Sequence, residues 1–344
     1  MADIVMTDDG IQFDGSSLEK GPLGGAETAF LSLAVALAGR GHRVRVFNRC
    51  PDAMTRDGVA WSPLTDQIPD RCDLYIANRS DKLLTLVDQA RCVVFWIHNP
   101  AQYLLKFRYL WKLMRRRTPI VFSGAYHAAT YPAWAPGGRR LVIPYGISSE
   151  FLSISRDGKP PPPRAIFTSN PLRGLDWLLD IWRTRIRPAC PTAELQLFSG
   201  AATYGAHGAA REAKMLPVLE KAASMSAEGV VLRDPVQKSD LARELAMARV
   251  LLYRGDPGET FCLAVGEAQA SGLPAVVMDI GCVAERVIHG KTGYVVDDDA
   301  AFADSAVELL TDESQWYLQS RAALASQREW TWDKAAAEFE DLVA

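Results

Sequence analysis

The chain has 344 residues, of which 48% are hydrophobic and 23% are charged, as in ordinary globular proteins. Its length exceeds that of one usual hydrophobic core, so we expect two domains, and no apolar run approaches the length of a membrane span. The six cysteines contain no Cys-x-x-Cys pair, which argues against a structural zinc site and a disulfide framework and suits a reducing cytosol.

The formal net charge of −3 is unevenly divided along the chain. Residues 1–150 hold 18 Lys and Arg against 14 Asp and Glu, a balance of +4, and the remaining residues hold 20 against 27, a balance of −7. The N-terminal half is therefore the one expected to meet an anionic partner. Because the first residues lack the basic segment of a secretory signal, we expect a cytoplasmic protein.

The N-terminal region predicts a strand, a glycine-rich turn and a helix. Residues 4–6 are apolar, Gly24 and Gly25 follow a polar loop, and a helix is expected over residues 26–38. A glycine-rich turn that enters a helix is typical of phosphate binding. A nicotinamide-dependent dehydrogenase is the rival interpretation. It is disfavoured because the glycines lack the Gly-x-Gly-x-x-Gly spacing and no acidic residue ends the next predicted strand, 43–47.

His98 directly follows a predicted buried strand, residues 92–97. The carboxyl ends of parallel strands form the edge at which such sheets bind ligands, so a histidine there is well placed for a functional role. A single histidine is also commonly a hydrogen-bonded structural residue. Both interpretations stay open at this point.

Residues 102–117 predict a basic, amphipathic helix. At 100° per residue one arc is apolar, and it consists of Tyr103, Leu104, Phe107, Leu110, Trp111 and Met114. The cations Arg108, Lys112, Arg115 and Arg116 lie opposite that arc. We expect either a helix that packs through its apolar arc and leaves the basic face in water, or a surface for anionic lipid or a phosphorylated acceptor. No recognition motif accompanies the charge, so nucleic-acid binding is disfavoured.

A change of composition separates the two halves of the chain. Residues 153–163 include four consecutive prolines and are expected to form a linker. A strand at 165–169 then opens the second domain, and Arg173 stands in the turn before a predicted helix, 175–187. An arginine in that position could neutralise a phosphate through its bidentate fork.

Residues 255–274 are the stretch that most strongly indicates a function. An apolar strand precedes a turn at Gly258, and a helix is expected from Thr260 to Ala270. The first amides of a helix attract anions. Glu259 and Glu267, eight residues apart, would be separated by ~80° of rotation and ~12 Å of rise in a helix. Two carboxylates beside an anion site suit a sugar–diphosphate–ribose ligand, and two solvated surface glutamates are the alternative.

The residues that follow extend this pattern. Glu-(seven residues)-Glu, the continuation Ala-Gln-Ala-Ser-Gly-Leu-Pro-Ala-Val-Val, and later Glu285, Gly290 and residues 292–296 resemble the retaining nucleotide-sugar glycosyltransferases of family 4. The resemblance implies the GT-B fold, an α/β architecture of two doubly wound, Rossmann-like domains facing a cleft. It implies an acceptor-side domain at 1–152, a nucleotide-sugar-binding domain at 164–329, and a C-terminal helix at 330–344 that packs back toward the first domain.

The resemblance also implies roles for single residues. On the donor side it assigns the sugar to Glu259, Thr260 and Phe261, the ribose to Glu267, the base to Pro235 and Val236, and the diphosphate to Arg173, Gly24, Gly25 and the amides after Gly258. His98 would help to place donor and acceptor, and the further acceptor-side candidates are Tyr126, His127, Arg108 and Lys112. Many family members have both an arginine and a lysine in the turn of Arg173. Here Arg173 takes the place of the lysine, and the arginine has no counterpart.

The function implied is retaining transfer of a sugar from a nucleotide-diphosphate sugar to a glycan, lipid-linked or small-molecule acceptor, in surface polysaccharide or glycoconjugate synthesis. No cofactor or metal is expected, because the departing phosphate itself takes the acceptor proton in the family's mechanism. A peripheral position at the inner membrane, through residues 102–117, is a further expectation. Two alternatives remain: another GT-B enzyme, such as an epimerase or phosphorylase, and a non-catalytic sugar-nucleotide-binding subunit.

Overall fold

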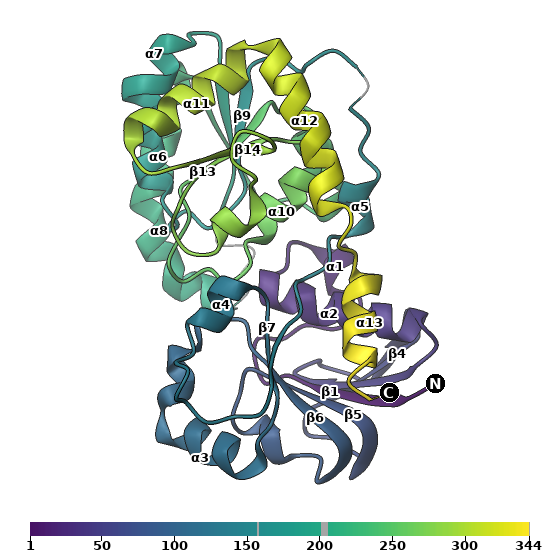
Figure 1. The fold of residues 1–344 in the computed structure, drawn as a ribbon. Helices are drawn as coiled ribbons and strands as arrows, with labels where there is room; N and C mark the ends of the chain where they lie inside the picture. The colour runs from purple at the N-terminus through teal and green to yellow at the C-terminus, as the bar shows by residue number, and fades with distance from the viewer. Residues whose placement is uncertain (157, 201–205, 344) are drawn as a thin grey trace. The chain divides into compact units, whose positions relative to one another are not determined.

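The computed structural model describes residues 1–156, 158–200 and 206–343, without the side chains of residues 206–211. The described chain divides into two compact units. Unit 1 comprises Met1–Gly146 and Trp330–Ala344, and unit 2 comprises Ile147–Glu329. Each unit is a parallel-sheet α/β structure, as Figure 1 shows.

Unit 1 contains an eight-stranded sheet with the order β3-β4-β2-β1-β5-β6-β7-β8. Every neighbouring pair is parallel except β3 and β4, which are antiparallel. The strands are β1 (Asp3–Thr7), β2 (Arg43–Asn48), β3 (Met54–Arg56), β4 (Val59–Pro63), β5 (Arg71–Asn78), β6 (Gln89–Trp96), β7 (Ile120–Phe122) and β8 (Arg140–Val142). The helices are α1 (Ser17–Lys20), α2 (Gly25–Gly39), η1 (Leu83–Thr85), η2 (Ala101–Leu105), α3 (Phe107–Arg116), α4 (Ala125–Ala129) and α13 (Trp332–Glu340).

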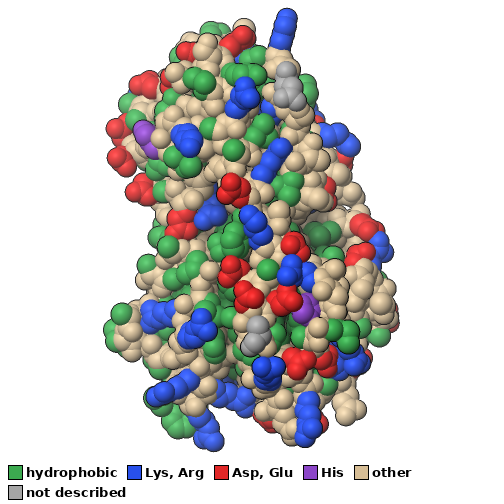
Figure 2. Space-filling view, turned by 45° about the vertical axis from the view of Figure 1, so that its right-hand side comes forward, with side chains coloured by type: hydrophobic (Ala, Val, Ile, Leu, Met, Phe, Trp, Pro, Cys, Tyr) green, Lys and Arg blue, Asp and Glu red, His purple; other side chains and the backbone are tan. Residues whose placement is uncertain are grey.

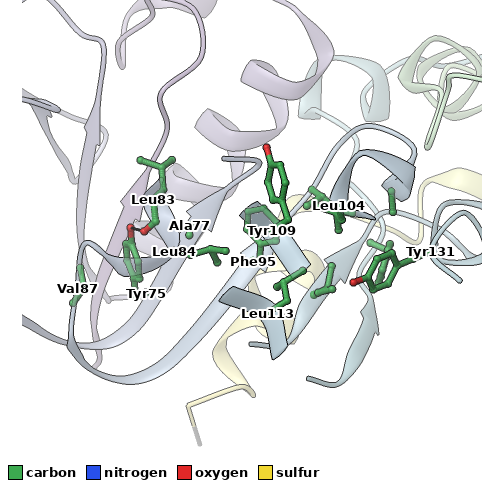
Figure 3. Close-up of a cluster of buried hydrophobic side chains, with 14 of the residues drawn as sticks. Tyr75, Ala77, Leu83, Leu84, Val87, Phe95, Leu104, Tyr109, Leu113 and Tyr131 are labelled. Atoms are coloured by element: carbon green, nitrogen blue, oxygen red, sulfur yellow. Dashed lines mark hydrogen bonds between the residues drawn. The ribbon is translucent and has the colours of Figure 1, made fainter. Parts of the chain in front are cut away.

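Alternate residues of the central strands of unit 1 serve two different cores, because side chains of a strand point to opposite faces. Trp96 of β6 lies on the face covered by α2 and α13, 5.4 Å from the ring of Phe339. Its neighbour Phe95 lies in the core on the other face, where Figure 3 shows it with Tyr109 and Leu113 of α3. The C-terminal helix α13 therefore completes the first core although it follows the whole of unit 2 in sequence.

Ion pairs also join the C-terminal helix to α2, and Figure 1 shows the two helices side by side. Arg40, at the end of α2, contacts Glu340 at 2.6 Å and Asp333 at 3.0 Å. These pairs are partly exposed, so they fix the helix position more than they stabilise it. The buried ring of Phe339 contributes the larger share through apolar burial.

Unit 2 contains a six-stranded, wholly parallel sheet with the order β11-β10-β9-β12-β13-β14. The strands are β9 (Arg164–Phe167), β10 (Glu194–Phe198), β11 (Val230–Arg233), β12 (Val250–Tyr253), β13 (Ala275–Met278) and β14 (Gly293–Val296). The helical segments are α5 (Ser149–Leu152), α6 (Leu175–Ile181), η3 (Trp182–Ile186), α7 (Arg187–Ala189), α8 (Ala206–Ser224), η5 (Ser226–Glu228), α9 (Lys238–Ala246), α10 (Leu263–Ala270), η6 (Val283–Arg286), α11 (Asp299–Thr311) and α12 (Glu313–Gln327). Figure 1 shows α6, α8 and α11 on one face of this sheet and α10 and α12 on the other.

The start of unit 2 differs from the expected linker. The N-terminal segment of unit 1 ends at Gly146, and α5 already packs on α9 and α10 of unit 2. Within the stretch expected to be a linker, Arg156 is buried and donates hydrogen bonds to the carbonyl oxygens of Leu245, Ala248 and Ser271 at 2.6, 3.1 and 2.9 Å. Residues before the prolines are thus part of the folded unit, because a buried guanidinium needs its acceptors in fixed positions.

Candidate functional site

The loop between β12 and α10 holds the first of the two predicted glutamates. The sequence predicts a helix from Thr260, but α10 begins at Leu263. The cause lies at Cys262, whose φ of 61° is in the left-handed region and cannot continue a helix. The expectation that Glu259 and Glu267 share one helix is therefore wrong. Glu259 lies in the preceding loop.

The amide of Gly258 does not stand at a helix start either. It donates to Oδ1 of Asp256 at 2.7 Å, and the amide of Glu259 donates to the carbonyl oxygen of Asp256 at 3.0 Å. Both amides therefore already have acceptors in this structure. A phosphate bound by Gly258 would have to displace the carboxylate of Asp256.

Glu259 is held in a fixed orientation by two partners. Its carboxylate accepts a hydrogen bond from Nη1 of Arg173 at 2.6 Å and one from the hydroxyl of Tyr253, also at 2.6 Å. Burial raises the pKa of this carboxyl, and the positive charge of Arg173 opposes the rise. The sequence named Arg173 and Glu259 separately, and the sheet brings them together because β9 and β12, the strands before them, are neighbours.

Glu267 lies within α10 and is also buried against a cation. Its carboxylate contacts the ammonium of Lys238, and that ammonium lies 5.4 Å from the ring centre of Phe151. Burial raises the pKa of Glu267, and Lys238 opposes the rise. Sequence reasoning did not single out Lys238. The available signal was its position just after the end of a predicted parallel strand, which is the ligand-binding edge.

Pro235 and Val236 lie between β11 and α9, separated from Lys238 by Gln237, and both are half-buried. Thr260 and Phe261 are buried, and the guanidinium of Arg286 lies 4.5 Å from the ring centre of Phe261. The donor-side candidates of unit 2 thus occupy the loops after β9, β11 and β12 and the helix α10. They offer two buried carboxylates, each beside a cation.

In unit 1, His98 belongs to a buried polar network at the ends of neighbouring strands. Its Nε2 lies 2.6 Å from Oδ1 of Asn78, whose amide nitrogen donates to Asp8 at 2.7 Å. Nε2 must therefore carry the proton, and Nδ1 accepts from the hydroxyl of Tyr145. Burial holds the pKa of His98 well below its usual range, so the imidazole is neutral.

The same network includes Arg79, which bonds Asp8 at 3.0 and 3.2 Å and Glu27 at 2.8 Å. The residues Asp8, Asn78 and His98 come together because β1, β5 and β6 are adjacent strands. Both ring nitrogens of His98 bond protein groups, so a ligand contact by this residue requires one of these bonds to be exchanged. The only feature of Arg79 visible in the sequence is its place directly after a strand.

Gly24 and Gly25 stand at the start of α2, as the turn predicts. Gly24 is the residue before the first helical turn, and its carbonyl oxygen accepts from the amide of Thr28 at 2.8 Å. Gly25 is exposed. This helix start, unlike that of α10, therefore agrees with the position expected from the sequence.

His127 is a buried residue whose ring bonds link two loops. Its Nδ1 accepts from the amide of Ser123 at 3.1 Å, and its Nε2 donates to the carbonyl oxygen of Asn99 at 2.9 Å. Burial lowers the pKa of His127 to about 4. Tyr126, the preceding residue in α4, is half-buried. This geometry gives His127 a structural role next to the loop of His98.

The structure contradicts the expected packing of residues 102–117. A 3-10 helix ends at Leu105, extended backbone follows at Lys106, and α3 begins at Phe107. Because the extended residue interrupts the helical period, the predicted apolar arc is divided. Tyr109 and Leu113 face the core, as Figure 3 shows. The arc members of α3 that are exposed are Phe107, Trp111 and Met114.

Two cations of the expected basic face are neutralised within unit 1. Arg108 contacts Asp81 at 3.3 Å, and Lys112 contacts the same carboxylate at 3.1 Å and the carbonyl oxygen of Asp81 at 2.6 Å. A phosphorylated acceptor would compete with Asp81 for both residues. They therefore fix α3 to the segment after β5.

Within residues 1–156, 158–200 and 206–343, no group of three or more His, Cys, Asp or Glu side chains is arranged to hold a metal ion. In the same part of the chain, no helix combines the length and the apolar character needed to cross a bilayer.

Comparison with known proteins identifies relatives of both the sequence and the fold. Residues 163–312 match the family model described as glycosyl transferases group 1. A 117-residue segment is 33% identical to D-inositol 3-phosphate glycosyltransferase of Xylanimonas cellulosilytica, over 33% of this chain and 28% of that protein. A 79-residue segment is 37% identical to N-acetyl-alpha-D-glucosaminyl L-malate synthase of Bacillus anthracis, over 22% of this chain and 20% of that protein. The matches therefore span less than a third of either relative.

Solved structures match along nearly the whole chain. Sucrose-phosphate synthase from Thermosynechococcus elongatus aligns with a TM-score of 0.71 and 18% identity, covering 99% of this chain and 98% of that one. The Anabaena protein HepE, solved with UDP and glucose, aligns with a TM-score of 0.72 and 14% identity, covering 99% of both chains. At these identities the likeness shows the fold, which is the GT-B fold that the resemblance predicted.

Proposed function

We propose that this protein is a retaining glycosyltransferase, because residues 163–312 match the family model described as glycosyl transferases group 1 and the chain has the GT-B fold. Its donor is a nucleotide-diphosphate sugar, bound by unit 2. The observation that carries the proposal is the pair of buried carboxylates, Glu259 and Glu267, each beside a cation at the carboxyl edge of a parallel sheet. The complex of HepE with UDP and glucose supports this class of ligand.

In the proposed reaction, the bond between the sugar C1 and the diphosphate oxygen breaks, and C1 bonds the acceptor oxygen on the same face. The departing phosphate oxygen takes the acceptor proton, so no further base and no metal are needed. Arg173 stabilises the charge that develops on the diphosphate. Preorganised charge of this kind is usually the largest catalytic contribution, and one unit charge at ~4 Å is worth roughly 4 kcal/mol at an effective dielectric of 20.

Glu259 orients hydroxyl groups of the donor sugar, and its contact with Tyr253 fixes the direction of its free lone pairs. Glu267 accepts from the ribose hydroxyls. Thr260, Phe261 and the backbone at Pro235 and Val236 line the sugar and base positions. In this proposal Arg173 exchanges Glu259 for the diphosphate when the donor binds, which the partial exposure of its side chain permits.

The acceptor in this proposal is a glycan, lipid-linked or small-molecule hydroxyl compound, and the reaction serves surface polysaccharide or glycoconjugate synthesis in the cytoplasm. In this proposal, His98 and the turn of Gly24 and Gly25 are the residues through which unit 1 binds its reactant. His98 acts as a neutral group that places the reactants, because burial lowers the pKa of its ring and disfavours uptake of a second proton.

The test is a panel of UDP-, GDP- and ADP-sugars, assayed for thermal stabilisation and slow hydrolysis without acceptor and without added metal. One nucleotide series is expected to stabilise the protein and release sugar with retained anomeric configuration. Glu259→Gln should abolish hydrolysis while the protein stays folded. Inverted product, or hydrolysis unchanged in Glu259→Gln, would refute the proposal. Binding without turnover with every acceptor would favour the non-catalytic alternative.

A further inference from the structure

Helix α3 presents an apolar face to solvent. Phe107, Trp111 and Met114 are 80%, 49% and 53% exposed. Their spacing of four and three residues places them on one side of the helix. Large apolar side chains that gather on one exposed face usually mark an interaction surface. We call these three residues the apolar face of α3.

The apolar face does not result from a loosely held helix. Tyr109 and Leu113 on the opposite side are buried in the core of unit 1. Arg116 contacts Asp88 at 3.0 Å and donates to the carbonyl oxygen of Leu84 at 3.2 Å. Since α3 is fixed on its inner side, its outer side is held in place as a preformed surface.

Cations lie at the ends of this surface. Lys106, Arg115 and Arg117 are all exposed, and none of the ion pairs among the described residues includes them. Arg117 ends α3 in the left-handed conformation, with φ of 47°. Figure 2 shows Lys and Arg side chains interspersed with hydrophobic ones at the lower end of the view. The surface therefore combines apolar side chains with uncompensated positive charge.

A neighbouring loop adds another exposed aromatic residue. Trp134 is 73% exposed. Its loop is joined to the end of α3 by a hydrogen bond from the amide of Gly138 to the carbonyl oxygen of Thr118 at 2.9 Å. The approach is close, because a Cβ on Gly138 would lie 2.1 Å from the carbonyl oxygen of Arg117. Trp134 thus lies in a loop that is joined, at Gly138, to the segment directly after α3.

We propose that the apolar face of α3 and Trp134 dock unit 1 on a bilayer that contains anionic phospholipid. The helix lies in the interface, with Phe107, Trp111 and Met114 at the acyl boundary. Lys106, Arg115 and Arg117 lie among the headgroup phosphates. Tryptophan is favoured at this depth, and basic residues around a hydrophobic face are the pattern of interfacial helices.

A lipid surface fits these observations better than a protein partner. An acidic protein could neutralise the cations, but the apolar face is the outer side of a helix, and its side chains are 49–80% exposed among the described residues. A bilayer needs no groove, and it accepts apolar side chains and cations on one plane. The link to a lipid-linked acceptor rests on the proposed transferase function, whereas the membrane contact does not.

The experiment measures co-sedimentation of the full chain with sucrose-loaded vesicles of phosphatidylcholine, with and without phosphatidylglycerol. The wild type should bind the anionic vesicles at least tenfold more tightly than the neutral ones. A variant with Phe107→Ser, Trp111→Ser and Met114→Ser should bind the anionic vesicles at least tenfold more weakly. A variant with Lys106→Gln, Arg115→Gln and Arg117→Gln should lose the preference for anionic lipid.

The matched control replaces three apolar residues of unit 2 that are 50–64% exposed, by Leu216→Ser, Met247→Ser and Leu318→Ser, and should bind within twofold of wild type. As an independent measurement, brominated lipid should quench tryptophan fluorescence, and Trp111→Phe should reduce that quenching. Any of three outcomes would overturn the proposal. The wild type could fail to bind anionic vesicles, the apolar variant could bind them as the wild type does, or Trp111→Phe could leave the quenching unchanged. Hydrolysis of a water-soluble donor stays unchanged in the apolar variant, so failure of the docking and failure of the transferase function are distinguishable.

Discussion

The buried charges of the two units are arranged in different ways. In unit 1, Arg79 bonds two carboxylates, those of Asp8 and Glu27, and Asp8 also accepts from Asn78. In unit 2, Glu259 and Glu267 each meet one cation, Arg173 and Lys238 respectively. A closed network satisfies its members and rigidifies a core, whereas a carboxylate held by a single cation can exchange that cation for a ligand. The comparison predicts that substitutions in the network of unit 1 lower the stability of the fold, whereas substitutions at the two pairs of unit 2 weaken donor binding or turnover.

The largest effect is expected from Asp8→Ala. Removing this fully buried carboxylate leaves the amide of Asn78 without its acceptor and Arg79 with Glu27 alone, and breaking a buried pair costs about 3–5 kcal/mol. The loss of unfolding free energy is measured by urea unfolding, followed by a spectroscopic signal from side chains of unit 1. Asp333→Ala removes an exposed partner of Arg40 and should change the free energy of unfolding by less than about 1 kcal/mol. Equal effects of the two changes would show that the network of unit 1 is not closed.

Arg173→Met should lower kcat by on the order of 10²–10³, because the diphosphate loses its preorganised charge. The change in kcat is measured by steady-state hydrolysis of the donor, at a temperature below that at which the variant unfolds. The control is Arg183→Met, which breaks a half-exposed pair with Glu228 in the same unit and should leave kcat within twofold. A kcat of Arg173→Met close to that of the wild type would show that the diphosphate does not bind at this turn.

His127 predicts a pH effect on stability that belongs to unit 1 alone. Its pKa is about 4 in the folded protein and 6.5 in the unfolded chain, so the unfolded state binds more protons between these values. The contribution of His127 to the free energy of unfolding is complete above pH 6.5. It decreases as the pH drops toward 4, by about 2 kcal/mol between pH 7 and pH 5. Unfolding experiments at both pH values should show a smaller drop in His127→Gln than in wild type. The exposed His289, changed to Gln, should leave the drop unaltered.

Lys238→Met should have the smallest effect, roughly a tenfold rise in donor KM with little change in kcat. Without the ammonium, burial raises the pKa of Glu267 further, so more of the carboxyl is protonated near neutral pH and accepts poorly from ribose hydroxyls. The rise in KM should therefore be larger at pH 6 than at pH 8. Lys221→Met, which removes a lysine of similar exposure paired with Asp176 and Asp180, is the control. A pH-independent KM in Lys238→Met would assign that lysine a packing role.

The sequence by itself determined the fold class and several candidate residues. The ordered pattern around Glu259 and Glu267 predicted the GT-B fold, which the structural comparisons confirm. The glycine-rich turn before α2 was located correctly at Gly24 and Gly25. These features are local: a turn, a strand period or a motif is written in consecutive residues, so it can be recognised without knowing what packs against it.

Only the tertiary structure decided which residues meet. Arg173 contacts Glu259 across 86 positions because β9 lies beside β12, and strand order is not written in either segment. Lys238 was missed for the same reason. The start of α10 depended on one left-handed residue, Cys262. Two features of the tertiary structure determine which side of α3 is exposed: the extended backbone at Lys106, and a core that buries Tyr109 instead of the larger apolar arc. The pattern of a helix shows two faces, but only the neighbouring elements determine which face is buried.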